Sequence, residues 1–222
     1  MTAFADFVAA RLVEFGRIDA ERRRVLDGLA TTIAAELRQH GAVDLVFVCT
    51  HNSRRSHLGQ VWALVAADHF GLAGVRTWSG GTEVTAFEPR AAAALARAGL
   101  DVRREDGGDA EVDVDNPIWQ VRHRDGGPAS RCWSKRFSDP PNPHSGFVAL
   151  LMCSGAAAAC PTVAGAATRV AIPYPDPKDA DGLPAERAAY DGAVADIARE
   201  MLFLLGRVAG SVGGQPPVRQ QT

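Results

Sequence analysis

The chain has 222 residues, of which 46% are hydrophobic and 23% are charged, values typical of a globular protein. Its formal net charge of −2 gives no reason to expect nucleic acid or an anionic membrane as a partner, and no apolar run approaches the ~18 residues of a spanning helix. Four cysteines are too few for a disulfide scaffold, and the N-terminus lacks the basic start of a secretory signal. We therefore expect a cytoplasmic protein with reduced thiols and no bound metal.

Residues 1–41 are predicted to form an N-terminal helical extension. Apolar residues recur at helical spacing from Phe4 to Phe15, and Gly16 is expected to end this first helix. Asp19 is a suitable N-cap for a second helix that ends before Gly41. The apolar stripes of the two helices predict either packing against the rest of the chain or a homodimer contact.

Residues 42–209 are predicted to form an α/β domain. Its expected strands are residues 43–48, 75–79, 146–152 and 168–172, and its expected helices are residues 56–70, 89–98 and 185–208. Alternation of strands and helices predicts a doubly wound parallel four-stranded sheet. The following tail, residues 210–222, is rich in Gly, Pro and Gln and is predicted to be disordered.

Residues 103–145 interrupt this alternation. The segments 116–121 and 130–137 flank Arg124-Asp125-Gly126-Gly127-Pro128, a sequence typical of a hairpin. We interpret the region as an insertion that is either a surface excursion or a flap over the site. Cys132 lies within it, and no nearby residue in the sequence would activate this thiol, so it is expected to be a packing residue.

The loop after the first strand carries the main chemical signal. Cys49 is followed by Thr50, His51, Asn52, Ser53 and Arg54, and then by Arg55-Ser56 at the start of a helix. The backbone N–H groups of such a loop can surround one tetrahedral anion, and the helix N-terminus adds its dipole. Arg55 offers a planar fork for two oxygens, while Ser56 can donate to the sulfur and Asn52 can brace the loop. The same field favours the thiolate of Cys49, so the pattern predicts a nucleophile within an oxyanion site for phosphate or arsenate.

Two further motifs follow later strands. Cys153 and Cys160 flank six small residues directly after the strand at 146–152. Asp176 lies between prolines in a rigid loop before the last helix, where an acid can protonate a leaving oxygen. A Cys-x6-Cys spacing is not typical of zinc sites.

The order of these motifs resembles the low-molecular-weight protein-tyrosine-phosphatase superfamily, and within it the thioredoxin-coupled arsenate reductases. The resemblance covers residues 43–208 and rests on the Cys49–Ser56 loop, on Ser79-Gly80-Gly81-Thr82, on Pro89, on the Cys153/Cys160 pair, and on Asp176-Pro177 with Gly182. The paired cysteines are its specific part, because ordinary phosphatases of this fold lack them.

The resemblance implies a role for each of these residues. Cys49 would attack arsenate, which Arg55 and the loop would hold, and Asp176 would donate a proton. Cys153 would then attack Cys49 and release arsenite. Cys160 would resolve the resulting disulfide and present a Cys153–Cys160 pair to thioredoxin or a similar thiol.

The loop departs from the superfamily's usual pattern at two positions, and two alternatives to arsenate reduction remain open. His51 stands where the superfamily usually has glycine, and the extra Arg54 either faces solvent or strengthens anion attraction. A protein-tyrosine or small-molecule phosphatase would use the same Cys49, Arg55 and Asp176 without the cysteine relay. A phosphate-binding module would keep the loop without catalysis.

Overall fold

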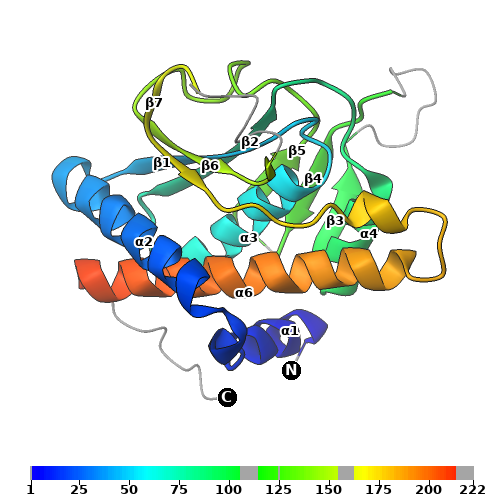
Figure 1. Ribbon diagram of the computed structural model, residues 1–222, viewed down its shortest axis with the longest axis horizontal. Helices are drawn as coiled ribbons and strands as arrows, with labels where there is room; N and C mark the ends of the chain where they lie inside the picture. The colour runs from blue at the N-terminus through cyan, green and yellow to red at the C-terminus, as the bar shows by residue number, and fades with distance from the viewer. Residues whose placement is uncertain (1, 106–114, 125, 155–162, 214–222) are drawn as a thin grey trace.

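A computed structural model describes residues 2–105, 115–124, 126–154 and 163–213 of the chain (Figure 1). Its centre is a four-stranded parallel sheet in the order β2-β1-β6-β7. The strands are β1 (Val43–Cys49), β2 (Val75–Gly81), β6 (Phe147–Leu151) and β7 (Ala166–Ala171). This sheet confirms the predicted α/β class and its four parallel strands.

Three helices of this domain lie near their predicted positions: α3 (Arg55–His69), α4 (Pro89–Arg97) and α6 (Glu186–Val212). A short 3-10 helix, η2 (Pro177–Ala180), precedes α6. Figure 1 shows α6 running along one side of the molecule, with α3 between it and the sheet. The prediction of a disordered tail from residue 210 is wrong at its start, because α6 continues to Val212 and its cap is Gly213 in the left-handed conformation. Residues 214–222 lie outside the described part.

The N-terminal extension forms α1 (Ala3–Leu12), the 3-10 helix η1 (Phe15–Arg17) and α2 (Ala20–His40). Asp19 and Gly41 cap α2 as predicted. Gly16 does not end the first helix, which stops four residues earlier, at Leu12. Phe15 leaves the helical path to pack edge-on against Phe203 of α6, and the Arg23 side chain donates to the carbonyl oxygens of Phe15 and Ile18.

The apolar stripes of α1 and α2 are covered within the same chain. Phe4 and Phe7 stack on Trp62 of α3, and the apolar side of α2 packs against α6. The buried residues of both helices belong to the same core cluster as the sheet: Val8, Leu26, Leu29, Ala30, Ile33 and Ala34. Packing thus accounts for the stripes, and a homodimer stays a prediction.

The insertion contributes a second, antiparallel sheet in the order β3-β4-β5. Its strands are β3 (Asp101–Arg104), β4 (Trp119–Arg122) and β5 (Ala129–Cys132). Pairing of β4 with β5 confirms the predicted hairpin, although both strands are shorter than expected. Cys132 is fully buried at the end of β5, and burial raises its pKa to about 12, so it is a packing residue as predicted.

The parallel sheet has an apolar layer on each face. Alternate residues of β1, such as Leu45 and Phe47, join the main core under α3 and α6. Val46 and Val48 point the other way, into a smaller cluster that includes Trp78 and Phe137. No helix of the described residues is long and apolar enough to cross a membrane.

Asp68 fixes the β4–β5 hairpin to the C-terminal end of α3. Its carboxylate accepts two hydrogen bonds from Arg124 and lies 2.8 Å from His123 Nε2. The bonds from Arg124, with those of His123, lower the pKa of Asp68 from 3.8 to about 2, against the opposing effect of burial. Because the pKa of the folded state is the lower one, the resulting stability is present above the unfolded value and is lost as the pH falls through the folded one.

We therefore expect Asp68→Asn to lower the free energy of unfolding by about 1–2 kcal/mol near neutral pH. The difference from the unmodified protein should shrink towards zero as the pH falls from about 4 to about 2. Urea denaturation at a series of pH values measures it. A difference that stays constant over this range would show that the Asp68 charge does not hold the hairpin.

Candidate active site

The loop from Cys49 to Ser56 lies at the C-terminal end of β1, a central strand of the sheet. Cys49 is the last residue of β1 and pairs in register with Gly81 at the end of β2. The chain then turns through Thr50–Arg54 and enters α3 at Arg55. Crevices at the C-terminal ends of parallel strands are the usual ligand sites of open α/β sheets.

The carbonyl oxygens of this loop are bound from outside. Those of Cys49 and Thr50 accept from the N–H groups of Thr82 and Glu83, and that of Ser53 accepts from Glu88 N–H. The carbonyl of His51 accepts from two hydroxyls, Ser134 Oγ at 2.8 Å and Thr85 Oγ1 at 3.1 Å. The β2–α4 connection and the insertion thus turn the negative ends of these peptide dipoles away from the loop centre.

The backbone N–H groups of the loop differ from its carbonyl oxygens, because they have no hydrogen-bond partner among the described residues. Among the described residues, no acceptor binds the backbone N–H of Thr50 through Ser56. Asn52 supports the turn with a left-handed φ of 45°, a conformation that asparagine tolerates better than most residues. Gly81 packs directly behind it, since a Cβ there would lie 2.7 Å from Thr50 O and 2.8 Å from Asn52 N. Unpaired N–H groups in such a turn form an anion-binding nest.

A directed chain of hydrogen bonds ends at the Cys49 sulfur. The backbone N–H of Lys135 donates to Asn52 Oδ1 at 3.0 Å, which fixes the orientation of the Asn52 amide. Asn52 Nδ2 can then only donate, and it lies 2.8 Å from Ser56 Oγ. The Ser56 hydrogen is therefore free to point at Cys49 Sγ, 3.1 Å away. The Ser56 hydroxyl is thus placed to donate to the Cys49 sulfur.

We expect Asn52→Ala to lower the free energy of unfolding by about 2–4 kcal/mol, because it leaves the buried Lys135 N–H unpaired and puts a Cβ-bearing residue without a polar side chain in a left-handed turn. The Ser56 hydroxyl would also lose the donor that orients it, so alkylation of Cys49 by iodoacetamide should slow. Urea denaturation and peptide mass spectrometry measure the two effects. A loss below about 0.5 kcal/mol would mean that Asn52 does not hold the loop.

Arg55 and Asp176 meet at the mouth of the loop. Arg55 Nη2 donates to Asp176 Oδ2 at 2.6 Å, and Nη1 donates to the carbonyl of Tyr174 at 3.0 Å. The other oxygen of Asp176 accepts from Lys178 N–H as the N-cap of η2. The segment that carries Asp176, the predicted acid, thus contacts Arg55, the predicted anion-binding residue. In this arrangement Asp176 is an acceptor through both oxygens.

Arg54 does not face solvent, one of the two alternatives that the sequence left open. Its side chain is 15% exposed and donates to Tyr190 Oη at 3.0 Å and to Glu88 at 3.1 Å, with Asp181 at 3.7 Å. These partners draw its guanidinium to the outside of the loop. His51 also points outward, with Nε2 3.3 Å from the Glu83 carboxylate.

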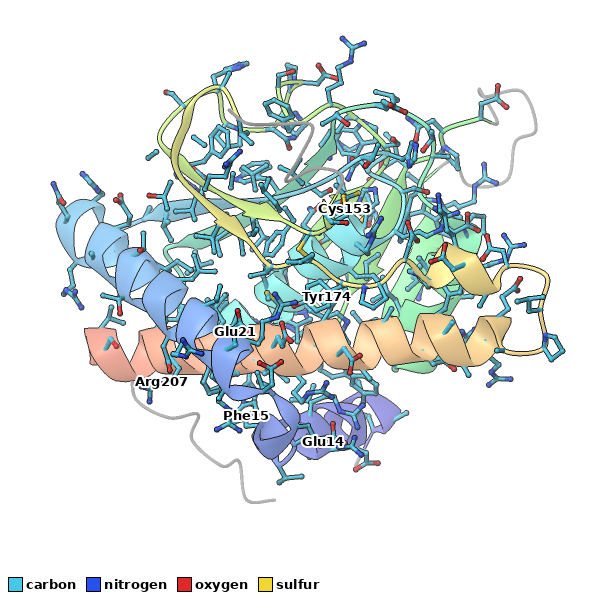
Figure 2. The ribbon with its side chains drawn as sticks, in the orientation of Figure 1. Glu14, Phe15, Glu21, Cys153, Tyr174 and Arg207 are labelled. Carbon is cyan, nitrogen blue, oxygen red and sulfur yellow. The ribbon has the colours of Figure 1, made fainter. Side chains whose placement is uncertain are left out.

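Cys153 lies beside the loop. It follows β6, the neighbour of β1 on the side opposite β2, and its sulfur is 3.6 Å from Thr50 Oγ1. Figure 2 shows Cys153 farther from α6 than Tyr174 is. Cys49 and Cys153 are both buried. Cys160, its predicted partner, lies outside the described residues.

His57 is a buried titratable group under the loop. It follows Ser56 on α3, and its Nδ1 lies 3.0 Å from Ser79 Oγ. Burial is the main reason that the pKa of His57 falls well below its ordinary value, and the charge of Lys135 acts in the same direction. The neutral imidazole adds no positive charge beneath Cys49.

The N-terminal extension also reaches the site, a contact that the sequence does not predict. Arg22 of α2 donates to the carbonyl of Pro173 at 2.6 Å, and its guanidinium lies 4.8 Å from the centre of the Tyr174 ring. Tyr174 Oη donates to Glu200 at 2.5 Å, and Arg22 Nε is 3.0 Å from the same carboxylate. The segment whose carbonyl binds Arg55 is thus fixed by α2 and α6.

The described end of the insertion matches neither of the two alternatives left open by the sequence, a surface excursion or a flap over the site. Ser134 and Lys135 bind the outer, carbonyl side of the loop and the amide of Asn52, and Arg136 bridges to Gly81 at the end of β2. These residues support the loop from behind and do not cover its N–H groups. Ser134 and Lys135 were not predicted as site residues, and no spacing rule links them to a loop more than eighty residues earlier.

Comparisons with known proteins give similarity only at the level of solved structures. No protein-family model matches the sequence, and no curated protein matches it. An arsenate reductase from Archaeoglobus fulgidus is 20% identical, with a TM-score of 0.44 over 73% of this chain and 98% of that one. A YwlE mutant from Bacillus subtilis is 16% identical, with a TM-score of 0.47 over 78% and 99%. A low-molecular-weight protein tyrosine phosphatase from T. tengcongensis is 16% identical, with a TM-score of 0.42 over 75% and 97%.

These solved structures include both groups that the sequence motifs resemble. Their names give different activities, since one is called an arsenate reductase and another a protein tyrosine phosphatase. This chain's own activity therefore has to follow from the geometry of its loop.

Proposed function

We propose that the chain is an enzyme in which the Cys49 thiolate attacks a tetrahedral oxyanion held by the N–H groups of residues 50–56 and by Arg55. The observation that carries this proposal is the directed chain from Lys135 N–H through Asn52 and Ser56 to the Cys49 sulfur. A packing cysteine needs no such donor, whereas a nucleophile inside an anion site does. The loop N–H groups, which have no acceptor among the described residues, would donate to the oxygens of the anion.

Arsenate reduction is the first candidate, because Cys153 adjoins Thr50. Attack by Cys49 forms a sulfur–arsenic(V) bond and expels one oxygen as water. The Cys153 thiolate then attacks the Cys49 sulfur, the sulfur–arsenic bond breaks, and arsenic leaves as arsenite with two electrons. Cys160 exchanges with the Cys49–Cys153 disulfide to leave a Cys153–Cys160 disulfide, which thioredoxin or a similar cytoplasmic dithiol reduces.

Hydrolysis of a phosphate ester is the second candidate, and the Arg55–Asp176 pair favours it. An oxyanion that engages the Arg55 fork would compete with Asp176 for this cation. Asp176 would then be released from Arg55 and would carry the proton that the leaving oxygen takes up. Water would release the phosphate from Cys49, and no second cysteine would be needed.

Two assays on the same preparation distinguish the candidates. Oxidation of reduced thioredoxin that depends on arsenate supports the reductase. Release of p-nitrophenol from p-nitrophenyl phosphate without added thiol supports the phosphatase. Phosphate binding with neither activity would leave only a binding module and would overturn the enzyme proposal.

The relay predicts a specific trapped bond. In Cys160→Ser, a single arsenate turnover should leave a Cys49–Cys153 disulfide, because the remaining thiol, Cys132, is fully buried in the insertion and cannot resolve it. The same variant should hydrolyse a phosphate ester as the unmodified protein does. Peptide mass spectrometry without reductant identifies the bond. Released arsenite with Cys49 and Cys153 both free would exclude the relay.

A further inference from the structure

A cavity of about 560 Å³ lies on the flank of the sheet, between α3, β2 and the insertion. Its apolar walls include Leu64, Leu72, Trp78 and Trp133, and Lys135 lines it as well. Its size is within the range of small-molecule sites, which bury most of a ligand against apolar and aromatic side chains.

Lys135 is a buried cation that forms no salt bridge with the described residues. It is 5% exposed, and its ammonium lies 4.2 Å from the centre of the Trp133 ring. Within the described part of the chain, no carboxylate and no hydrogen-bond acceptor lies within bonding distance of this ammonium. The two arginines that line the cavity differ in this respect, since Arg76 pairs with Asp44 and Arg131 with Glu105.

Burial of an unpaired ammonium is unfavourable unless a ligand or a fixed dipole compensates for it. Burial indeed lowers the pKa of Lys135 to about 8, although the negative charge of Asp139 opposes this shift. Backbone hydrogen bonds hold Lys135 in this position although burial of its ammonium is unfavourable. Lys135 N–H donates to Asn52 Oδ1, and its carbonyl accepts from Gly81 N–H at 2.8 Å. The ammonium is therefore presented to the cavity by a fixed backbone.

We propose that this cavity binds a small aromatic anion, with its carboxylate at the Lys135 ammonium and its ring against the wall formed with Trp78 and Trp133. The anion would supply the counter-charge that Lys135 lacks, and the aromatic ring would fill apolar volume that the chain leaves open. This site is separate from the Cys49 loop and does not depend on the proposed function.

The chain has only two lysines, Lys135 and Lys178, which gives the experiment an internal control. Lys178 is exposed on η2 and does not line the cavity. The probe is 1-naphthoate, with neutral 1-naphthalenemethanol as its uncharged analogue, and binding is measured by isothermal titration calorimetry. Saturating inorganic phosphate is present throughout, so that the Cys49 loop is occupied.

We expect 1-naphthoate to bind with an affinity at least about tenfold higher than the alcohol. Lys135→Met should reduce the affinity for naphthoate to that of the alcohol, Lys135→Arg should retain part of it, and Lys178→Met should leave it unchanged. No detectable naphthoate binding, or equal binding by the unmodified protein and Lys135→Met, would overturn the proposal.

A second measurement needs no variant of the buried lysine. Acetylation of the unmodified protein by acetic anhydride, read by peptide mass spectrometry, gives the reactivity of both lysines in one sample. Naphthoate should slow acetylation of Lys135 about fivefold or more and leave that of Lys178 unchanged. Equal acetylation of Lys135 with and without naphthoate would overturn the proposal even if binding were detected elsewhere.

Discussion

Replacing Cys49 with serine is expected to lower turnover of arsenate or of a phosphate ester about a thousandfold or more. A serine hydroxyl stays protonated in this site, because none of the described residues is a general base beside it: Ser56 Oγ is its neighbour at 3.1 Å, and His57 binds Ser79 instead. The change is nearly isosteric, so the melting temperature should change by only a few degrees. Steady-state kinetics and thermal denaturation measure the two effects.

Cys132→Ala is the matched control for this variant. Cys132 is fully buried in the insertion, away from the loop N–H groups, so its loss should lower stability and leave kcat/KM unchanged below the melting temperature. Full activity in Cys49→Ser, or an equal loss of activity in both variants, would remove Cys49 from the role of nucleophile.

Arg55→Lys is expected to lower kcat/KM about a hundredfold and to weaken phosphate binding in parallel. Lysine keeps the charge but cannot hold two anion oxygens at once. It also cannot bind both the Tyr174 carbonyl and Asp176 in the geometry that the guanidinium uses. Competitive inhibition by inorganic phosphate reads the binding part. The same inhibition constant in both proteins would show that Arg55 does not touch the anion.

Local features of the fold follow from the sequence. Asp19 and Gly41 mark the ends of α2 because caps act on their own helix, and the strand, loop and helix around Cys49 follow from a contiguous apolar run and its turn. Boundaries shift where distant packing intervenes. Phe15 is drawn towards Phe203, so α1 ends before Gly16, and α6 continues through Gly210 because Val208 and Ala209 are still buried.

The support of the site does not follow from local pattern. The residues that orient the loop come from the insertion, as Ser134 and Lys135 do, or from the connection after β2, as Thr85 and Glu88 do. Their main-chain groups do much of the binding, and backbone donors leave no signature in residue type. The link from Arg22 to the Tyr174 segment joins residues about 150 positions apart, and only the folded chain places them together.

Alkylation of Cys49 at neutral pH, with and without inorganic phosphate, tests the central claim most directly. Iodoacetamide labelling followed by peptide mass spectrometry reads each of the four cysteines separately. We expect Cys49 to react faster than the buried Cys132, phosphate to protect Cys49, and Arg55→Lys to lose most of this protection. Labelling of Cys49 at the rate of Cys132, or a rate that phosphate does not change, would contradict a thiolate at the centre of an oxyanion site.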